Sequence, residues 1–103
     1  MIPALIAKQD QLAQVCRAYG VVRLEVFGSA ADDSFDPARS DVDFIVEFQP
    51  GTDLGPWLTR YFQLRNELAA LLGRAVDLAM ASALRNPQFI NEANRTRKLL
   101  YAR

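Results

Sequence analysis

The amino-acid sequence predicts an α/β (α+β) fold in which helices cover a small mixed β-sheet. Apolar residues recur at helical spacing in some segments and at every second position in others. These segments follow one another as helix, strand, strand, helix, strand, helix. Half of the 103 residues are apolar and 23% are charged, which is typical of a globular chain with one modest core. We therefore expect a single domain over residues 1–103.

The first helix is expected over residues 3–18, where apolar side chains follow helical spacing and Gly20 can end the helix. Residues 22–26 then alternate between apolar and charged, which predicts a strand with one buried face that ends at Gly28. A second strand is expected over residues 41–48, after a polar stretch. Its alternation places Val42, Phe44 and Val46 opposite Asp41, Asp43, Ile45 and Glu47.

A broad apolar stripe predicts one long helix in the middle of the chain. The stripe starts at Trp57 and stops at Gly73, after a loop over residues 49–55. Aromatic residues at helical spacing usually belong to the core, so we expect two of the three rings of Trp57, Tyr61 and Phe62 to be buried. Three large rings on a short chain also leave room for a dimer or partner surface.

The last third of the chain predicts a strand, a helix and a short closing strand. Residues 75–79 form the strand, with Asp77 on the side opposite its apolar neighbours. Asn86 followed by Pro87 fits an N-cap and a first helical position, and opens a helix through about Arg95. Residues 99–101 can close the chain as a strand.

Composition excludes several kinds of chemistry. With one cysteine and no histidine, the chain cannot form an intramolecular disulfide, a Cys/His zinc site or a histidine-dependent triad. We interpret Cys16, which lies at helical apolar spacing, as a buried small hydrophobe. No stretch is apolar enough for a membrane span and the N-terminus lacks a signal peptide's apolar centre, so we expect a cytoplasmic protein.

The charges are segregated along the chain although the net charge is zero. Residues 25–53 hold eight acids and one base, which is either an exposed acidic loop or a metal site. Residues 54–103 hold three acids and eight bases. Direct nucleic-acid binding through the basic C-terminal end is not expected, because such clusters are usually solvated helix faces.

Asp41 and Asp43 form the first part of a candidate site. Two residues apart on a strand, their carboxylates leave the same face, and Mg²⁺ is a natural compensator of their repulsion. The alternative is the solvated face of an edge strand. The Gly28-Ser29 turn after the preceding strand favours the site, because such a turn can hold phosphate oxygens. Ser40 directly before the pair and Asp77 on a later strand favour it too.

The text VFGSAADDSFDPARSDVDFIVEF followed by AVDLAM resembles the nucleotidyltransferase superfamily that includes DNA polymerase beta, most closely its antitoxin-type minimal (MNT) members. ALRNPQFINEANRTRKLLYAR also looks like their terminal segment. The resemblance implies the polymerase-beta-like fold, with Gly28, Ser29 and Ser40 binding a nucleoside triphosphate and Asp41, Asp43 and Asp77 binding catalytic metal. Two Mg²⁺ ions would act in the transfer, and Asp77 would help to take the proton of the attacking hydroxyl.

The resemblance also implies a partner. Minimal members are typically paired with a HEPN-domain RNase toxin, and some transfer AMP to a tyrosine of that partner, so antitoxin activity is the expected role. One departure concerns the phosphate turn, where many family members have Ala-Arg-Gly and this chain has Ala31-Asp32-Asp33. An acid near the triphosphate would oppose binding. The alternative is therefore a catalytically impaired module that neutralises its partner by contact.

Overall fold

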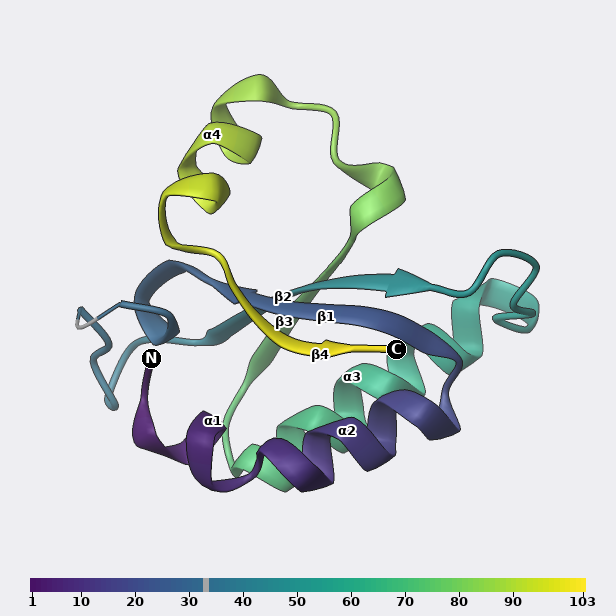
Figure 1. Cartoon of the computed structure of the whole chain (residues 1–103), viewed down its shortest axis with the longest axis horizontal. Helices are drawn as coiled ribbons and strands as arrows, with labels where there is room; N and C mark the ends of the chain where they lie inside the picture. The colour runs from purple at the N-terminus through teal and green to yellow at the C-terminus, as the bar shows by residue number, and fades with distance from the viewer. Residues whose placement is uncertain (33) are drawn as a thin grey trace.

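The computed structural model describes residues 1–32 and 34–103, and its strands form one mixed sheet in the order β3-β2-β1-β4 (Figure 1). β1 lies at the centre and runs antiparallel to both β2 and β4, whereas β2 and β3 are parallel. The strands are β1 (Val21–Phe27), β2 (Val42–Phe48), β3 (Val76–Met80) and β4 (Lys98–Ala102). The expected mixed sheet with covering helices is confirmed.

Helices cover the two faces of the sheet unequally. α1 (Pro3–Ala7), α2 (Gln9–Ala18) and α3 (Thr59–Leu72) lie on one side, and α4 (Pro87–Thr96) lies alone over the other (Figure 1). The main core fills the first side. It contains alternate residues of β1 and β2 together with the inner faces of the helices: Leu12, Cys16, Leu24, Val26, Phe44, Val46, Leu64 and Leu68.

Several local predictions are confirmed. Gly73 ends α3 in the left-handed conformation at φ +67°, which a glycine adopts without steric cost. The Asn86 side chain caps α4 by accepting hydrogen bonds from the backbone N–H groups of Gln88 and Phe89. Cys16 is fully buried, and burial raises the pKa of its thiol to about 12, which removes it as a nucleophile.

The single helix expected over residues 3–18 is wrong, because the chain leaves helical geometry at Lys8 and forms α1 and α2 instead. The Lys8 ammonium donates to the carbonyl oxygen of Leu71 at the end of α3, 2.9 Å away. This tertiary contact lies between segments far apart in the sequence. Local periodicity therefore cannot reveal it.

The expectation that two of three aromatic rings are buried is also wrong. Only Tyr61 packs against the core, whereas Trp57 is 94% exposed and Phe62 is 41% exposed. Trp57 and Leu58 both have positive φ, so α3 starts only at Thr59. The two residues before it therefore do not extend the apolar face of the helix. Three large apolar side chains near the start of α3 are therefore exposed, namely Trp57, Leu58 and Phe62.

The sheet face under α4 is more buried than alternation predicts. Glu25 and Ile45, which pair across β1 and β2, are 7% and 2% exposed. Arg97, just after α4, forms two hydrogen bonds with the Glu25 carboxylate at 2.6 and 3.0 Å. The ion pair compensates the burial of the Glu25 charge and lowers the pKa of that carboxyl. In the ranges that the structure describes, no helix is long and apolar enough to cross a membrane.

Candidate active site

The parallel pairing of β2 and β3 brings two of the predicted carboxylates together. Asp43 and Asp77 are direct partners in the register, so both side chains leave the same face of the sheet. Burial is the largest cause that raises the pKa of Asp43, to about 6, followed by the charge of Asp77 and a hydrogen bond with it, and then by the charge of Asp41. Two carboxylates this close repel each other when both are ionised, so binding of a proton or a cation between them is favoured.

Asp41 lies just before β2, which starts at Val42 and not at residue 41 as the alternation predicts. Its side chain is exposed, although its charge reaches Asp43. Within the described part of the chain, no three Asp, Glu, His or Cys side chains converge closely enough to hold one metal ion. Asp43, which is partly buried, and Asp77, which is exposed, present carboxylate oxygens, the ligands that Mg²⁺ prefers. The three-carboxylate set stays a prediction.

Gly28 lies directly beside Asp43 of this pair. It follows the last residue of β1, Phe27, which is the register partner of Asp43. The backbone of Gly28 has φ +72°, and a Cβ added there would lie 2.8 Å from Oδ2 of Asp43. Both the conformation and the close approach require glycine at this position. The predicted phosphate turn and the predicted metal ligand are therefore in contact in the folded chain.

Two hollows lie on either side of this contact. The first, of about 400 Å³, is lined by Asp43 and Asp77, and we call it the carboxylate hollow. The second, of about 260 Å³, is lined by Gly28 and Ser29, and we call it the turn hollow. Phe27 and Phe89 line both hollows, and their rings meet edge to face with centroids 5.5 Å apart. The two hollows are therefore neighbours that share this aromatic pair as lining.

A family model described as a nucleotidyltransferase domain matches residues 9–100. The chain belongs to the nucleotidyltransferase domain family. A solved structure described as a candidate minimal nucleotidyltransferase is 30% identical, with a TM-score of 0.71 over 91% of this chain and 90% of the other. The resemblance to minimal nucleotidyltransferases is therefore confirmed, as is the fold class.

Two further similarities concern proteins with named activities. The protein adenylyltransferase MntA of Thermococcus cleftensis is 38% identical over 73 residues, which cover 66% of this chain and 64% of that protein. The match thus spans just under two thirds of the relative's length. A complex of a tri-AMPylated Shewanella oneidensis HEPN toxin with an MNT antitoxin contains the same fold, at 18% identity and a TM-score of 0.65, over 96% of this chain and 73% of the other.

In this nucleotidyltransferase domain, Asp32 lies beside the turn as its sequence position suggests. Asp32 lines the turn hollow, and its carboxylate accepts a hydrogen bond from the backbone N–H of Ser34, at 2.8 Å. Two hydrogen bonds from Ser34 lower the pKa of Asp32, and the bond from the Ser34 hydroxyl has a larger effect than the bond from its backbone N–H. The carboxylate therefore stays ionised at neutral pH. The expectation about Asp33 lies outside the described residues.

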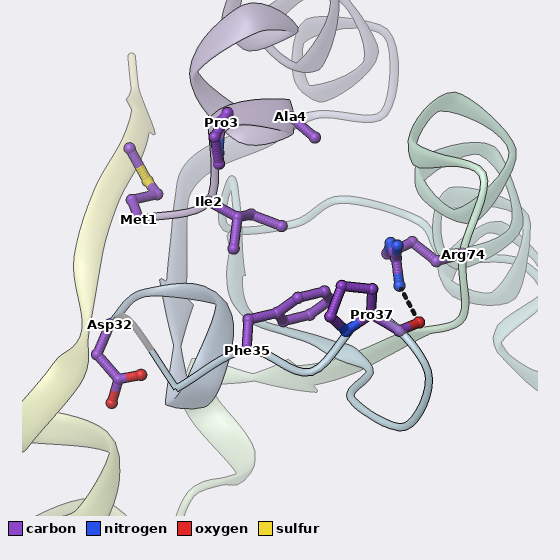
Figure 2. A pocket seen from close by; sticks show the side chains of 8 residues that line it. All are labelled: Met1, Ile2, Pro3, Ala4, Asp32, Phe35, Pro37 and Arg74. Carbon is purple, nitrogen blue, oxygen red and sulfur yellow. Dashed lines mark hydrogen bonds between the residues drawn. The ribbon is translucent and has the colours of Figure 1, made fainter.

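A third hollow, also of about 400 Å³, shares Asp32 but contains none of the predicted site residues (Figure 2). Figure 2 shows Asp32 at one edge of this hollow and Arg74 at the opposite edge, where its guanidinium donates to the carbonyl of Pro37 at 3.1 Å. Arg74 also stacks over the Phe35 ring. The Arg74 side chain is therefore fixed against Phe35 and Pro37 by this stacking and this hydrogen bond.

Ser29 and Ser40 differ in how the nucleotidyltransferase fold uses them. Ser29 lines the turn hollow, and its hydroxyl has no hydrogen bond to any described residue, so it is available to a ligand. Ser40 accepts a hydrogen bond from the backbone N–H of Asp36 at 3.0 Å and lines neither the turn hollow nor the carboxylate hollow. Its hydroxyl stabilises the loop before β2, and its role in nucleotide binding stays a prediction.

Sequence reasoning missed the contribution of α4 to the site. Thr96, the last residue of α4, accepts a hydrogen bond from the Gly28 backbone N–H at 2.7 Å, so this amide binds the helix and not a ligand. Phe89, Thr96 and Arg95 all line the turn hollow. Only the path of the chain back over the sheet brings them there. Their spacing in the sequence carries no signal of it.

Proposed function

We propose that this chain is a Mg²⁺-dependent nucleotidyltransferase that transfers AMP from ATP to a hydroxyl of a partner protein. The contact between Gly28 and Asp43, with Asp77 as the register partner of Asp43, is the observation that carries the proposal. It unites a turn suited to phosphate with a carboxylate pair suited to a divalent cation, in a chain that belongs to the nucleotidyltransferase domain family.

The residues divide the reaction between the two hollows. Asp43 and Asp77, with Asp41 beside them, would hold Mg²⁺, which supplies charge neutralisation for the phosphate oxygens. The Ser29 hydroxyl would bind the triphosphate in the turn hollow. Asp77 is exposed at the edge of the carboxylate hollow and would accept the proton of the attacking hydroxyl. The new bond joins this hydroxyl oxygen to the α-phosphorus, and pyrophosphate leaves with the electrons of the broken bond.

The proposed partner is a HEPN-domain toxin, and the biological role is that of its antitoxin. The name of the Thermococcus relative and the AMPylated Shewanella complex support this acceptor class. The exposed apolar side chains of Trp57, Leu58 and Phe62 support a protein partner, because large exposed rings are enriched at interfaces. Self-association through the same side chains stays a prediction.

The decisive experiment combines the purified chain with α-labelled ATP, Mg²⁺ and the protein encoded next to it. We expect label on a hydroxyl side chain of that protein, and none after chelation with EDTA. A Glu47→Gln variant is the matched control, because Glu47 is an exposed acid on β2 outside the site. Absence of transfer with every nucleoside triphosphate would remove the proposed activity.

A second candidate function is neutralisation of the partner by contact alone. The ionised Asp32 carboxylate beside the turn favours it, since this charge repels phosphate. Isothermal titration with ATP and Mg²⁺ separates the two functions, because the contact module predicts no metal-dependent ATP binding.

Under either function, Trp57→Ser should weaken partner binding at least tenfold without changing the melting temperature. An unchanged affinity would place the interface elsewhere.

A further inference from the structure

Two consecutive residues at the C-terminal end of α4, Thr96 and Arg97, hold this helix against the site. Thr96 accepts the hydrogen bond from the Gly28 amide, and Arg97 forms its two hydrogen bonds with the buried Glu25 of β1. These contacts fix the last turn of α4 relative to both the phosphate turn and the sheet. The residue before them, Arg95, lines the turn hollow together with Gly28 and Ser29.

The charges of the turn hollow need such a residue if phosphate is to bind there. Asp32 and Glu92 contribute carboxylates to its lining, and Arg95 is the one cation among the described residues that line it. The phosphate turn itself continues from Ser29 through Ala30 and Ala31 to Asp32, without a basic side chain. The one cationic side chain among the described residues that line this hollow is therefore supplied by α4.

Arg95 can exchange its present partner for a ligand. Its guanidinium nitrogen Nη1 lies 3.0 and 3.2 Å from the two carboxylate oxygens of Glu92. Both side chains are about three-quarters exposed, at 73% and 72%, and an exposed ion pair of this kind is weak. A guanidinium binds phosphate oxygens in a bidentate, charge-assisted manner, which is the stronger interaction.

We propose that Arg95 binds the β- and γ-phosphates of the nucleotide in the turn hollow and leaves Glu92 to do so. The inference rests on the proposed function, and it adds the residue that supplies positive charge to the triphosphate. The α-phosphate would lie toward the carboxylate hollow, and the phosphates beyond it would extend past Phe27 and Phe89 toward Arg95. Glu92 acts as a competitor for the same guanidinium.

Isothermal titration of ATP and of AMP, each with Mg²⁺, tests the assignment on the intact chain. Arg95→Gln should weaken ATP binding about tenfold and leave AMP binding unchanged, because AMP lacks the two phosphates concerned. Glu92→Gln should strengthen ATP binding, by about threefold, since it removes the competitor. The matched control is Arg65→Gln, which removes an arginine that stacks on Phe62 away from both hollows, and should change neither affinity.

The outcomes are distinct. ATP binding by Arg95→Gln that equals that of the original chain would overturn the inference and leave the proposed function intact. Equal losses for ATP and AMP would also overturn it, because they would show a structural effect of the substitution. If the original chain binds no nucleotide with Mg²⁺, the proposed function fails and the inference fails with it. A thermal melt of each variant confirms that it is folded.

Discussion

Asp43 and Phe44 are adjacent residues of β2, and their side chains leave opposite faces of the sheet. Phe44 is completely buried in the core beneath α2 and α3, whereas Asp43 is only partly buried, on the side of α4, although both residues are among those that line the carboxylate hollow. The core side holds the strand in register, and this register keeps Asp43 opposite Asp77 in spite of their repulsion. Packing on the core face of β2 therefore stabilises the register that holds the two carboxylates together on the opposite face.

The largest effect should come from the site face. Asp43→Asn should lower the rate of AMP transfer about 1000-fold, equivalent to roughly 4 kcal/mol, because the amide is a poor ligand for Mg²⁺. The measurement is a single-turnover rate with labelled ATP, with Glu47→Gln as the control on the same strand. The comparison of faces would be broken if Asp43→Asn kept its rate or if the melting temperature fell in parallel.

On the core face, Phe44→Ala should lower the free energy of unfolding by about 3 to 5 kcal/mol, because it leaves a cavity in a closed core. Urea denaturation followed by circular dichroism measures this. Phe44→Leu fills more of the space and should cost less, so it remains measurable if the alanine variant does not fold. A loss below about 1 kcal/mol for Phe44→Ala would show that this face is not tightly packed.

Gly28→Ala should lower both the transfer rate and the free energy of unfolding. The added Cβ approaches Asp43 Oδ2 to 2.8 Å, so we expect a transfer rate about 100-fold lower and a stability loss of roughly 1 kcal/mol from the positive φ. Gly73→Ala is the matched control, since Gly73 also has positive φ, at +67°, but no atom lies within 4 Å of its added Cβ. It should lose similar stability and keep its activity. Equal activity in both variants would exclude the clash as the cause.

The smallest effect concerns pH. Without metal, the pKa of Asp43 is raised from 3.8 to about 6 in the folded chain. A raised pKa stabilises the folded state fully below pH 3.8, and this contribution is lost as the pH rises through about 6. Since Asp43 is partly solvated, we expect a loss of only about 1 kcal/mol. Urea denaturation in EDTA should show it for the original chain and not for Asp43→Asn, and equal curves would contradict it.

The sequence predicted the features that depend on local patterns, and it missed those that depend on tertiary contacts. Period-two alternation located β2 to within one residue, and the N-cap of Asn86 placed the start of α4 correctly. The same alternation put Asp43 and Asp77 on strands, which the parallel register then joined. These features depend on neighbours in the chain, and short-range patterns report them well.

The failures involve either contacts between distant segments or a local backbone conformation that the residue types do not dictate. The break at Lys8 accompanies a contact with α3, and the exposure of Trp57 follows from two residues with positive φ that no composition rule demands. The role of Arg95 depends on Thr96 reaching Gly28 across the sheet. Within the basic C-terminal end, Arg97 pairs with Glu25 of β1, and the sequence around Arg97 carries no signal of this distant partner.

The parallel pairing of β2 and β3 also determines when the site can exist during folding. Parallel neighbours need a crossover, here the whole of α3, whereas β1 and β2 can pair through a loop. Closing the longer connection comes with a greater entropic cost, so β3 should join the sheet after the β1–β2 hairpin has formed. A nascent chain released before that step would hold Gly28 and Asp43 but not the pairing of Asp43 with Asp77.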